Sequence, residues 1–560
     1  MRALRKPMLA VGLAAATLGA TQVAGAEDQT AHRYVVVYDR SAGVADARAA
    51  VEAAGGAIVS ENRAIGVATV SSRDANFIAK ADGQQALDGA AADRPIGRSP
   101  RGTVQPHRFD ESRVGQGAAK RPGPAGPAGE PFSDAQWDMR MIGATPTGSY
   151  RTQPGSKGVR VGIIDTGVDA SHPDIAPNFD ARLSRNFTTD MPDIDGDCAE
   201  EADHSCSDAA DTDEGGHGTH VAGEIAAAIN GIGTAGVAPN VDIVNLRAGQ
   251  DSGYFFLQPS LDALTYAGDN GIDVVNMSYY IDPWLYNCAS NPADSPEEQA
   301  QQRTIIEATQ RALSYARDHG VTLVSALGNE DDDLGHPEPD DSSPDYGAPP
   351  HHREIDNSTC LSMPTEGNGV IGVSSVGPSK RKAYYSNYGV EQTDVSAPGG
   401  DSRDNGTGLA SPSNTILAPY PEAALQEECR PPHPASDCVI NPDGSPKSAG
   451  VILQKRDGRN VYWRYLQGTS MASPHATGVV ALIVSEFGSR DRANGGLKLD
   501  PATAERILRR SATDTACPDP RTLDYGLGEK YIATCEGPKP DNGFYGDGIV
   551  SAERAVSGRR

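Results

Sequence analysis

Residues 159–164 read Val-Arg-Val-Gly-Ile-Ile and run directly into Asp165-Thr166-Gly167. A short run of β-branched and aliphatic side chains predicts a buried strand. Similar runs follow at 241–245, 272–276 and 321–325, and segments of helical composition lie between them at 221–229, 259–267 and 304–317. Strands that alternate with helices predict an α/β fold, with a parallel sheet flanked by helices on both faces. Ligands of such a sheet bind at the carboxyl ends of its strands.

A second informative stretch is Gly468-Thr469-Ser470-Met471-Ala472-Ser473-Pro474-His475, which opens a helical segment that continues over 476–487. A serine in the first turn of a helix lies in a field that favours developing negative charge. Its hydroxyl is a weak nucleophile and needs a neutral imidazole to take its proton. An ordinary Ser/Thr helix cap would produce the same residues. This stretch alone therefore leaves both interpretations open.

A histidine and an aspartate occupy positions that complement this serine. His217-Gly218-Thr219-His220 follows the Gly215-Gly216 turn and begins a helix, where core packing explains a histidine poorly. The two histidines do not have the H-E-x-x-H spacing of zinc proteases. Asp165 follows the strand at 159–164, and a carboxylate there can accept a hydrogen bond from an imidazole N–H and stabilise the imidazolium.

Taken together, the three motifs resemble the subtilisin-like serine protease (subtilase) family, which has the chain order Asp, His, Ser. The resemblance extends over about residues 33–555. It implies a serine endopeptidase that hydrolyses protein and peptide substrates through an acyl-enzyme. Asp165, His217 and Ser470 would be its catalytic triad, and the chemistry would need no cofactor.

The resemblance also implies roles for residues around the triad. Asn329 matches the asparagine that donates to the oxyanion, although Gly-Asn before acidic residues is also a common turn. Ser278 matches the strand that pairs with the substrate backbone, a form of β-strand addition, and Gly328 is a second substrate-binding candidate. The chain departs from the family at Tyr279-Tyr280, where a small residue is usual. Either these rings reshape the specificity pocket, or the insertion at 281–300 shifts them away from the cleft.

Residues 32–95 predict a separate small α+β domain. Strands are expected at 34–38, 57–60 and 65–70 and helices at 44–54 and 73–81, an order similar to the inhibitory propeptide of subtilases. The Pro-, Gly- and Arg-rich stretch at 96–131 offers few apolar side chains to bury and predicts a flexible linker that contains a processing site. Residues 132–560 then form the peptidase domain, with the propeptide as its inhibitor.

Residues 1–26 predict a signal peptide. Arg2, Arg5 and Lys6 precede an apolar run at 8–20, and Ala24-Gly25-Ala26 provides a small-x-small cleavage site. No later segment is long and apolar enough to span a bilayer, so we expect a secreted, extracellular protein without a membrane anchor. We also expect a monomer. The net charge of −26 disfavours nucleic acid and anionic membrane surfaces as partners.

Eight cysteines, an even number, fit an oxidising compartment. No C-x-x-C pair indicates a zinc site. Spacing does not determine connectivity, but neighbours in the sequence favour the disulfides Cys198–Cys206, Cys429–Cys438 and Cys517–Cys535, which leaves Cys288 with Cys360.

Two other functions and a possible metal deserve consideration. Asp165-Thr166-Gly167 and Asp251-Ser252-Gly253 mimic the paired aspartates of an aspartic protease, which share a proton, but that hypothesis leaves the His217 and Ser470 motifs unexplained. An inactive binding protein on the same scaffold would require a broken triad, and none is broken here. Structural calcium is a further possibility, since oxygen-rich loops suit it. Its candidate residues, with no ligand set assigned, are Asp174, Asn230, Asp193, Asp195 and Asp197.

Overall fold

The computed structural model describes residues 31–93, 111 and 130–557, except 193, 200–203, 346–347, 405–408 and 431–437. The predicted signal peptide at 1–26 and most of the predicted linker at 96–131 lie outside the described residues. Asp193, one of the candidate calcium ligands, also lies outside them.

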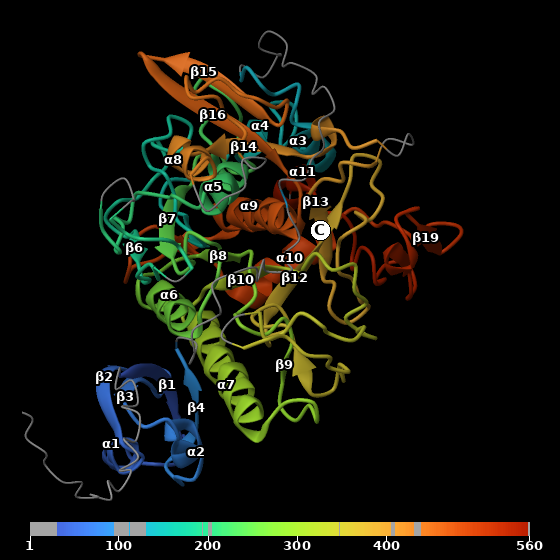
Figure 1. Cartoon of the computed structure of the whole chain (residues 1–560). Helices are drawn as coiled ribbons and strands as arrows, with labels where there is room; N and C mark the ends of the chain where they lie inside the picture. Colours follow the sequence, from blue (N-terminus) through green and yellow to red (C-terminus); the bar gives the residue numbers. More distant parts are fainter. Residues whose placement is uncertain are drawn as a thin grey trace, which may run out of the picture.

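A seven-stranded parallel sheet forms the centre of the molecule (Figure 1). From one edge to the other its strands are β13 (Val395–Pro398), β12 (Val370–Val376), β10 (Thr322–Ala326), β8 (Val274–Met277), β5 (Arg160–Ile164), β7 (Asp242–Arg247) and β6 (Arg185–Asn186). The four strands that the sequence predicts are β5, β7, β8 and β10, which are neighbours in the middle of the sheet. The α/β fold with a parallel sheet is confirmed.

Helices cover both faces of this sheet, as predicted. On β5, Val161 and Ile163 pack into the core formed with α5 (His217–Ala226) and α9 (Thr469–Phe487), whereas Ile164 packs on the opposite face with α6 (Leu257–Asp269) and α7 (Pro296–Asp318). This follows from the alternation of side chains along a strand. Helix α9 is buried from residue 469 to residue 485, so it is the central helix of the fold.

Helix α7 begins earlier than the sequence analysis predicts. The predicted segment starts at residue 304, but the helix starts at Pro296 because Ser295 and Glu298 form a capping box. The Oγ of Ser295 accepts a hydrogen bond from the backbone N–H of Glu298 at 3.2 Å, and the carboxylate of Glu298 accepts one from the N–H of Ser295 at 2.7 Å. The Ser-Pro-Glu-Glu sequence at 295–298 carries this signal.

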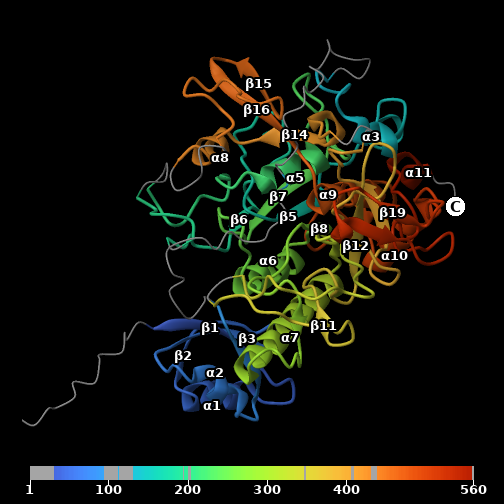
Figure 2. The same cartoon turned by 45° about the vertical axis from the view of Figure 1, so that its right-hand side comes forward.

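The N-terminal unit is a four-stranded antiparallel sheet of order β2-β3-β1-β4 with two helices (Figures 1 and 2). Its elements are β1 (His32–Tyr38), α1 (Val44–Ala53), β2 (Gly56–Asn62), β3 (Val67–Ser72), α2 (Phe77–Asp82) and β4 (Leu87–Ala92). Strand β4 was not predicted, because its sequence Leu-Asp-Gly-Ala-Ala-Ala lacks β-branched and aromatic residues. It forms through pairing with β1.

The N-terminal unit packs against α6 and α7. Val35, Val37 and Ile65 belong to the same buried cluster as the side chains of those helices. Arg311 of α7 donates from Nη1 to the carbonyl oxygen of Tyr38 at 2.8 Å and forms an ion pair with Asp88. The interface combines buried apolar side chains with the directional contacts of a nearly buried arginine. The N-terminal unit therefore has one defined position on α6 and α7.

The remaining elements surround the sheet. A second antiparallel sheet contains β14 (Ile416–Tyr420), β16 (Arg459–Leu466) and β15 (Val451–Arg456), and β16 leads into α9 across two residues. The others are α3 (Trp137–Ile142), α4 (Ser149–Thr152), α8 (Glu422–Glu427), α10 (Pro501–Ser511), α11 (Ala552–Val556), η1 (Pro412–Asn414), η2 (Glu529–Tyr531), β9 (Asn287–Cys288) paired with β11 (Cys360–Leu361), β17 (Ser489–Arg490) with β18 (Leu497–Lys498), and β19 (Thr522–Asp524) with β20 (Ile532–Thr534).

All four predicted disulfides are confirmed. They are Cys198–Cys206, Cys288–Cys360, Cys429–Cys438 and Cys517–Cys535. Three of them close short loops, whereas Cys288–Cys360 joins the loop after β8 to the loop after β10. Within the part of the chain that the structure describes, every helix is too short or too polar to cross a membrane.

Candidate active site

Asp165 and His217 meet where β5 ends and α5 begins. His217 Nδ1 lies 2.8 Å from Asp165 Oδ1, and Asp165 is fully buried. The backbone N–H of Thr166 also donates to Oδ1, at 2.8 Å. A Cβ atom on Gly218 would lie 2.1 Å from the carbonyl oxygen of Gly167, so only glycine lets the helix start approach the strand end this closely. The His-Gly sequence therefore has a packing reason as well as a chemical one.

Ser470 lies in the first turn of α9 and is tied to β8. Asn276 of β8 accepts hydrogen bonds at Oδ1 from Ser473 Oγ at 2.7 Å and from Thr477 Oγ1 at 3.0 Å, and its Nδ2 donates to Ser278 Oγ at 2.9 Å. Ser278 in turn donates to the carbonyl oxygen of Ser470 at 3.1 Å. This hub was not predicted, and its one signal in the sequence is a pair of hydroxyl residues, Ser473 and Thr477, four apart on one face of α9.

Asn329 follows β10 and faces the same helix start. Its Oδ1 accepts from the backbone N–H of Thr469 at 2.8 Å and from Thr469 Oγ1 at 3.0 Å, which fixes the amide so that Nδ2 points into the cleft. Gly328 has a φ of 107°, and a Cβ there would lie 2.4 Å from Asn387 Nδ2. Its N–H donates to Thr469 Oγ1 at 3.0 Å. Gly328 thus lines the cleft and also allows the sharp turn that presents Asn329.

One residue of the predicted linker lies between these groups. Glu111 Oε2 is 3.0 Å from His217 Nε2, and Glu111 Oε1 is 3.4 Å from Asn329 Nδ2. Burial alone would lower the pKa of His217, but the carboxylates of Asp165 and Glu111 outweigh that effect and raise it well above its usual value of 6.5. The sequence analysis assigned no contact to Glu111, because nothing local marks it.

These residues share one cavity of about 910 Å³. His217, Ser278, Gly328, Asn329 and Ser470 all line it. The structure therefore brings together, around one cleft at the carboxyl ends of β5, β8 and β10, the site residues that the sequence predicts.

The subtilase family model, Peptidase_S8, matches residues 156–529, well over half of the chain. The chain belongs to the subtilase family. It is a serine protease of that family.

Two relatives agree with this assignment, and a solved structure has a similar fold. Subtilisin DY of Bacillus licheniformis is 27% identical over 398 residues, which cover 71% of this subtilase and 90% of the relative. Fervidolysin of Fervidobacterium pennivorans is 26% identical over 425 residues, or 74% of this subtilase, but the match spans only 46% of fervidolysin. The crystal structure of the epidermin leader peptide processing serine protease from Staphylococcus aureus has a TM-score of 0.61 at 20% identity and covers 94% of this chain and 98% of that one, a likeness of fold.

Tyr279 and Tyr280, the departure from the family pattern, both line the cleft of this subtilase. The ring of Tyr279 stacks on Phe255 at a centroid distance of 4.2 Å and is nearly buried. The hydroxyl of Tyr280 donates to Asp345 Oδ2 at 2.9 Å. The insertion after β8 therefore does not shift the rings away from the cleft. Instead, Asp345, in the loop after β10, holds Tyr280 at the wall.

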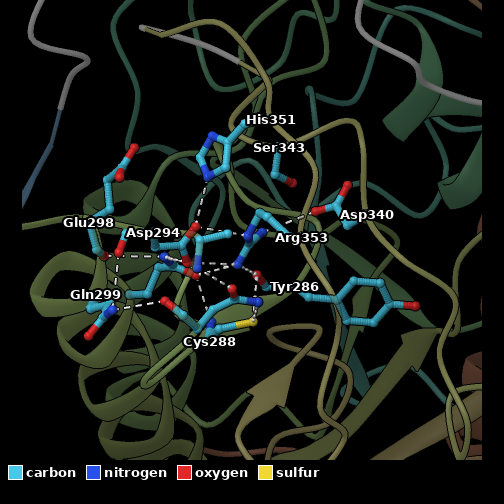
Figure 3. A network of polar contacts seen from close by, with 12 residues as sticks. Tyr286, Cys288, Asp294, Glu298, Gln299, Asp340, Ser343, His351 and Arg353 are labelled. Carbon is cyan, nitrogen blue, oxygen red and sulfur yellow. Dashed lines mark hydrogen bonds and ion pairs between the residues drawn. The ribbon is translucent and has the colours of Figure 1, made fainter. Parts of the chain in front are cut away.

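A buried arginine joins the insertion after β8 to the loop after β10 (Figure 3). Arg353 is fully buried and forms ion pairs with Asp294, at 3.1 Å, and with Asp340, at 3.0 Å. It also donates from Nη2 to the carbonyl oxygen of Tyr286 at 3.0 Å. The side chain of Tyr286 extends from this network toward the cleft, where its hydroxyl donates to Asp332. Arg353 thus connects the disulfide-bonded insertion to the wall of the cleft.

A second buried arginine bears on the aspartic protease hypothesis. Arg247 forms ion pairs with Asp251, at 3.1 Å, with Asp190, at 2.8 Å, and with Asp208. Asp251 is therefore paired with an arginine, while Asp165 is paired with His217. The two carboxylates do not form a proton-sharing pair, so that hypothesis is wrong for this subtilase.

The candidate calcium ligands have protein partners. Asp174 Oδ2 accepts hydrogen bonds from Trp463 Nε1 at 2.9 Å and from the N–H of Thr234 at 3.1 Å, and burial raises the pKa of Asp174 to about 7. Asp195 accepts from the N–H groups of Met191 and Ser252, and Asn230 Oδ1 from that of Ile232. Among the described residues, two groups are compact enough to hold a cation, Asp294-Glu298-His351 and Asp190-Asp208-Asp251, and each already contacts a buried arginine. Each of these side chains already has at least one partner from the protein itself, and structural calcium stays a prediction.

Proposed function

We propose that this subtilase is a secreted serine endopeptidase that cleaves proteins through an acyl-enzyme and is made as a self-processing zymogen. The observation that carries the proposal is the 2.8 Å contact between His217 Nδ1 and Asp165 Oδ1, at a cleft that Ser470 and Asn329 also line. In this assignment Ser470 is the nucleophile, His217 the general base, Asp165 the orienting carboxylate and Asn329 the oxyanion donor.

In the first step, Ser470 Oγ attacks the carbonyl carbon of the scissile peptide bond while its proton passes to His217 Nε2. Asp165 accepts the Nδ1 proton of His217 as a hydrogen bond, which keeps Nε2 available as the acceptor and stabilises the imidazolium that forms. Because Asp165 is buried, this interaction acts in a low-dielectric environment.

The negative charge that develops on the carbonyl oxygen needs a donor that is already in place. Asn329 Nδ2 can supply it, because Thr469 holds the other end of the amide. The tetrahedral intermediate then collapses: the C–N bond breaks and His217 returns the proton to the leaving amine. Water repeats the sequence on the acyl-enzyme and releases the carboxylic acid.

Substrate binding is proposed for the segment after β8 and the turn before Asn329. Ser278 and Gly328 both line the cleft, and an extended peptide would pair with their backbone as an added strand. The rings of Tyr279 and Tyr280 then form part of the wall that meets the substrate side chain. Protein and peptide substrates follow from the family assignment, and their sequence preference is set by this wall.

The zymogen proposal rests on the N-terminal unit. Its fold and its contact with α6 and α7, through Arg311 and the cluster around Val35 and Ile65, support a propeptide domain that spans 32–95. Cleavage within 96–131 would separate it from the peptidase domain at 132–560. The signal sequence at 1–26 and four disulfides support export to an oxidising, extracellular location.

Expression of the full-length chain with Ser470→Ala tests this proposal. We expect the precursor to accumulate uncut and casein hydrolysis to fall by about 10⁶-fold, the loss known for the subtilisin nucleophile. The wild-type chain and the control Ser314→Ala, an exposed serine on α7, should mature and appear in the culture medium. A Ser470→Ala protein that matures and digests casein would show that the triad assignment is wrong, and an inert wild-type chain would favour the binding-protein alternative.

A further inference from the structure

The side chain of Glu111 lies between the two groups that the proposed mechanism uses first. Its Oε2 is 3.0 Å from His217 Nε2 and its Oε1 is 3.4 Å from Asn329 Nδ2. Its backbone is held as well, since the N–H of Gln467, just before α9, donates to the carbonyl oxygen of Glu111 at 3.1 Å. The residue is therefore anchored at both its main chain and its carboxylate.

This position conflicts with a bound substrate. Asn329 Nδ2 is the proposed donor to the carbonyl oxygen of the scissile bond, and here it faces Glu111 Oε1. The carboxylate also lies close against the backbone that precedes Ser470, because a Cβ on Gly468 would come within 2.6 Å of Oε1. A substrate carbonyl and the Glu111 carboxylate cannot occupy this place together.

The charge of Glu111 affects the base in a second way. His217 has a carboxylate on each ring nitrogen, Asp165 at Nδ1 and Glu111 at Nε2. A histidine with two anionic partners is stabilised as the imidazolium, which carries both protons. The proposed mechanism requires Nε2 to be unprotonated so that it can accept the proton of Ser470. Glu111 thus opposes the first proton transfer as well as substrate entry.

We propose that Glu111 is an inhibitory residue of the precursor, whose carboxylate pairs with protonated His217 and occupies the oxyanion donor Asn329 until the side chain leaves the cleft. This inference rests on the proposed function, because it assigns a consequence to the same base and donor. It differs from inhibition by the N-terminal unit, whose contacts described here are with α6 and α7, away from His217.

The test measures the reactivity of Ser470 in precursor that is still uncut. Purified full-length protein is treated with a fluorescent fluorophosphonate, which reacts with an activated serine, and the uncut and mature bands are separated by electrophoresis. Base catalysis contributes about 10²–10⁴-fold to such steps. We therefore expect the uncut band of Glu111→Gln to label about tenfold faster than that of the wild type, or more. Glu52→Gln, at an exposed glutamate on α1, should label at the wild-type rate.

One further variant, compared with Glu111→Gln, separates the charge from the bulk of the side chain. Glu111→Ala removes both and should also label fast. If only Glu111→Ala labels fast, the ion pair is not the cause of inhibition, and if neither variant differs from the wild type the proposal is overturned. Failure of the mature wild-type protein to label would instead refute the proposed function. The pKa of His217 can be measured by NMR titration in the Ser470→Ala precursor, because self-cleavage does not interfere there. We expect a lower pKa in the double variant Ser470→Ala/Glu111→Gln than in Ser470→Ala, and an unchanged pKa would overturn the proposal.

Discussion

Replacing Asn329 by alanine removes one hydrogen-bond donor from the cleft while Asp165, His217 and Ser470 stay in place. In the structure, both ends of the Asn329 amide are engaged. Its Oδ1 accepts two hydrogen bonds from Thr469, at 2.8 and 3.0 Å, and Nδ2 faces the cleft. The variant should therefore affect catalysis through Nδ2 and folding stability through Oδ1, and the two effects can be measured separately.

The catalytic loss should be large. Loss of one oxyanion donor lowers kcat by about 10²–10³, which corresponds to about 2.7–4 kcal/mol, the value known for subtilisin rather than one worked out from this structure. KM should change little, because the donor acts mainly on the charge that develops after binding. The stability cost should be smaller, about 1–3 kcal/mol for donors of Thr469 that lose their acceptor.

The assay has to avoid wild-type contamination, since one molecule in a thousand would match the residual activity expected at the upper limit of this loss. Self-processing of the variant should slow by the same factor as substrate hydrolysis, so its linker is cut with immobilised trypsin at the arginines between 96 and 131. The trypsin is then removed. Initial rates on a peptide anilide give kcat and KM, and thermal unfolding of the same sample gives the stability change.

Two results would refute the assignment of Asn329. One is a fall in kcat of less than about threefold in a folded variant, which would mean that Nδ2 contributes nothing to the transition state. The other is a raised KM with unchanged kcat, which indicates uniform binding of substrate and transition state. Thr469→Ser, which retains both hydrogen-bond donors to Asn329, should keep kcat near the wild-type value and serves as the control.

Three other predictions concern pH, specificity and metals. The value of kcat/KM should rise with pH, because His217 accepts a proton only when it is neutral, and an acidic optimum would contradict this. The acid limb of the pH profile should lie at lower pH in the mature enzyme than in the precursor, because Glu111 raises the pKa of His217 in the precursor. Tyr280→Ala should favour peptides with a large aromatic residue before the cut, because it removes the ring that Asp345 fixes at the wall. The ratio of kcat/KM for these peptides to kcat/KM for peptides with alanine at that position should rise about tenfold. An unchanged ratio on a peptide panel would refute that role. Chelation by EDTA should leave initial rates at 25 °C unchanged, because the proposed mechanism assigns no step to a metal ion, while a lower Tm in EDTA would reveal the structural calcium.

The sequence predicts the parts of this site that local signals encode. Asp165 follows an aliphatic strand, His217 follows a Gly-Gly turn, and Ser470 lies at the start of a helix. Each position can therefore be predicted from its local sequence, without knowledge of the others. The chain order of the three residues then identifies the arrangement. The middle strands of the sheet and three of the disulfides were also predicted from local signals, whereas Cys288–Cys360 was the pair that remained.

Other features depend on contacts between distant segments. Asn276 is a buried hub because Ser473 and Thr477 lie opposite it, about two hundred positions further along the chain. Strand β4 has a composition that favours no strand and exists only because β1 offers it a partner. Glu111 reaches His217 from a stretch whose composition predicts only a linker. In each case the tertiary partner supplies the free energy that local propensity lacks.

The network around Arg353 has a consequence for redesign of the enzyme. Its partners Asp294, Asp340 and Tyr286, and the disulfide Cys288–Cys360, all belong to the stretch between β8 and β12. That stretch also contains α7, the central strand β10 and Asn329. Arg353 and the disulfide therefore join two loops, one before α7 and one after β10. A redesign of the pocket wall has to exchange both loops together, because replacement of a single buried charge would leave the remaining charges without their counter-ion.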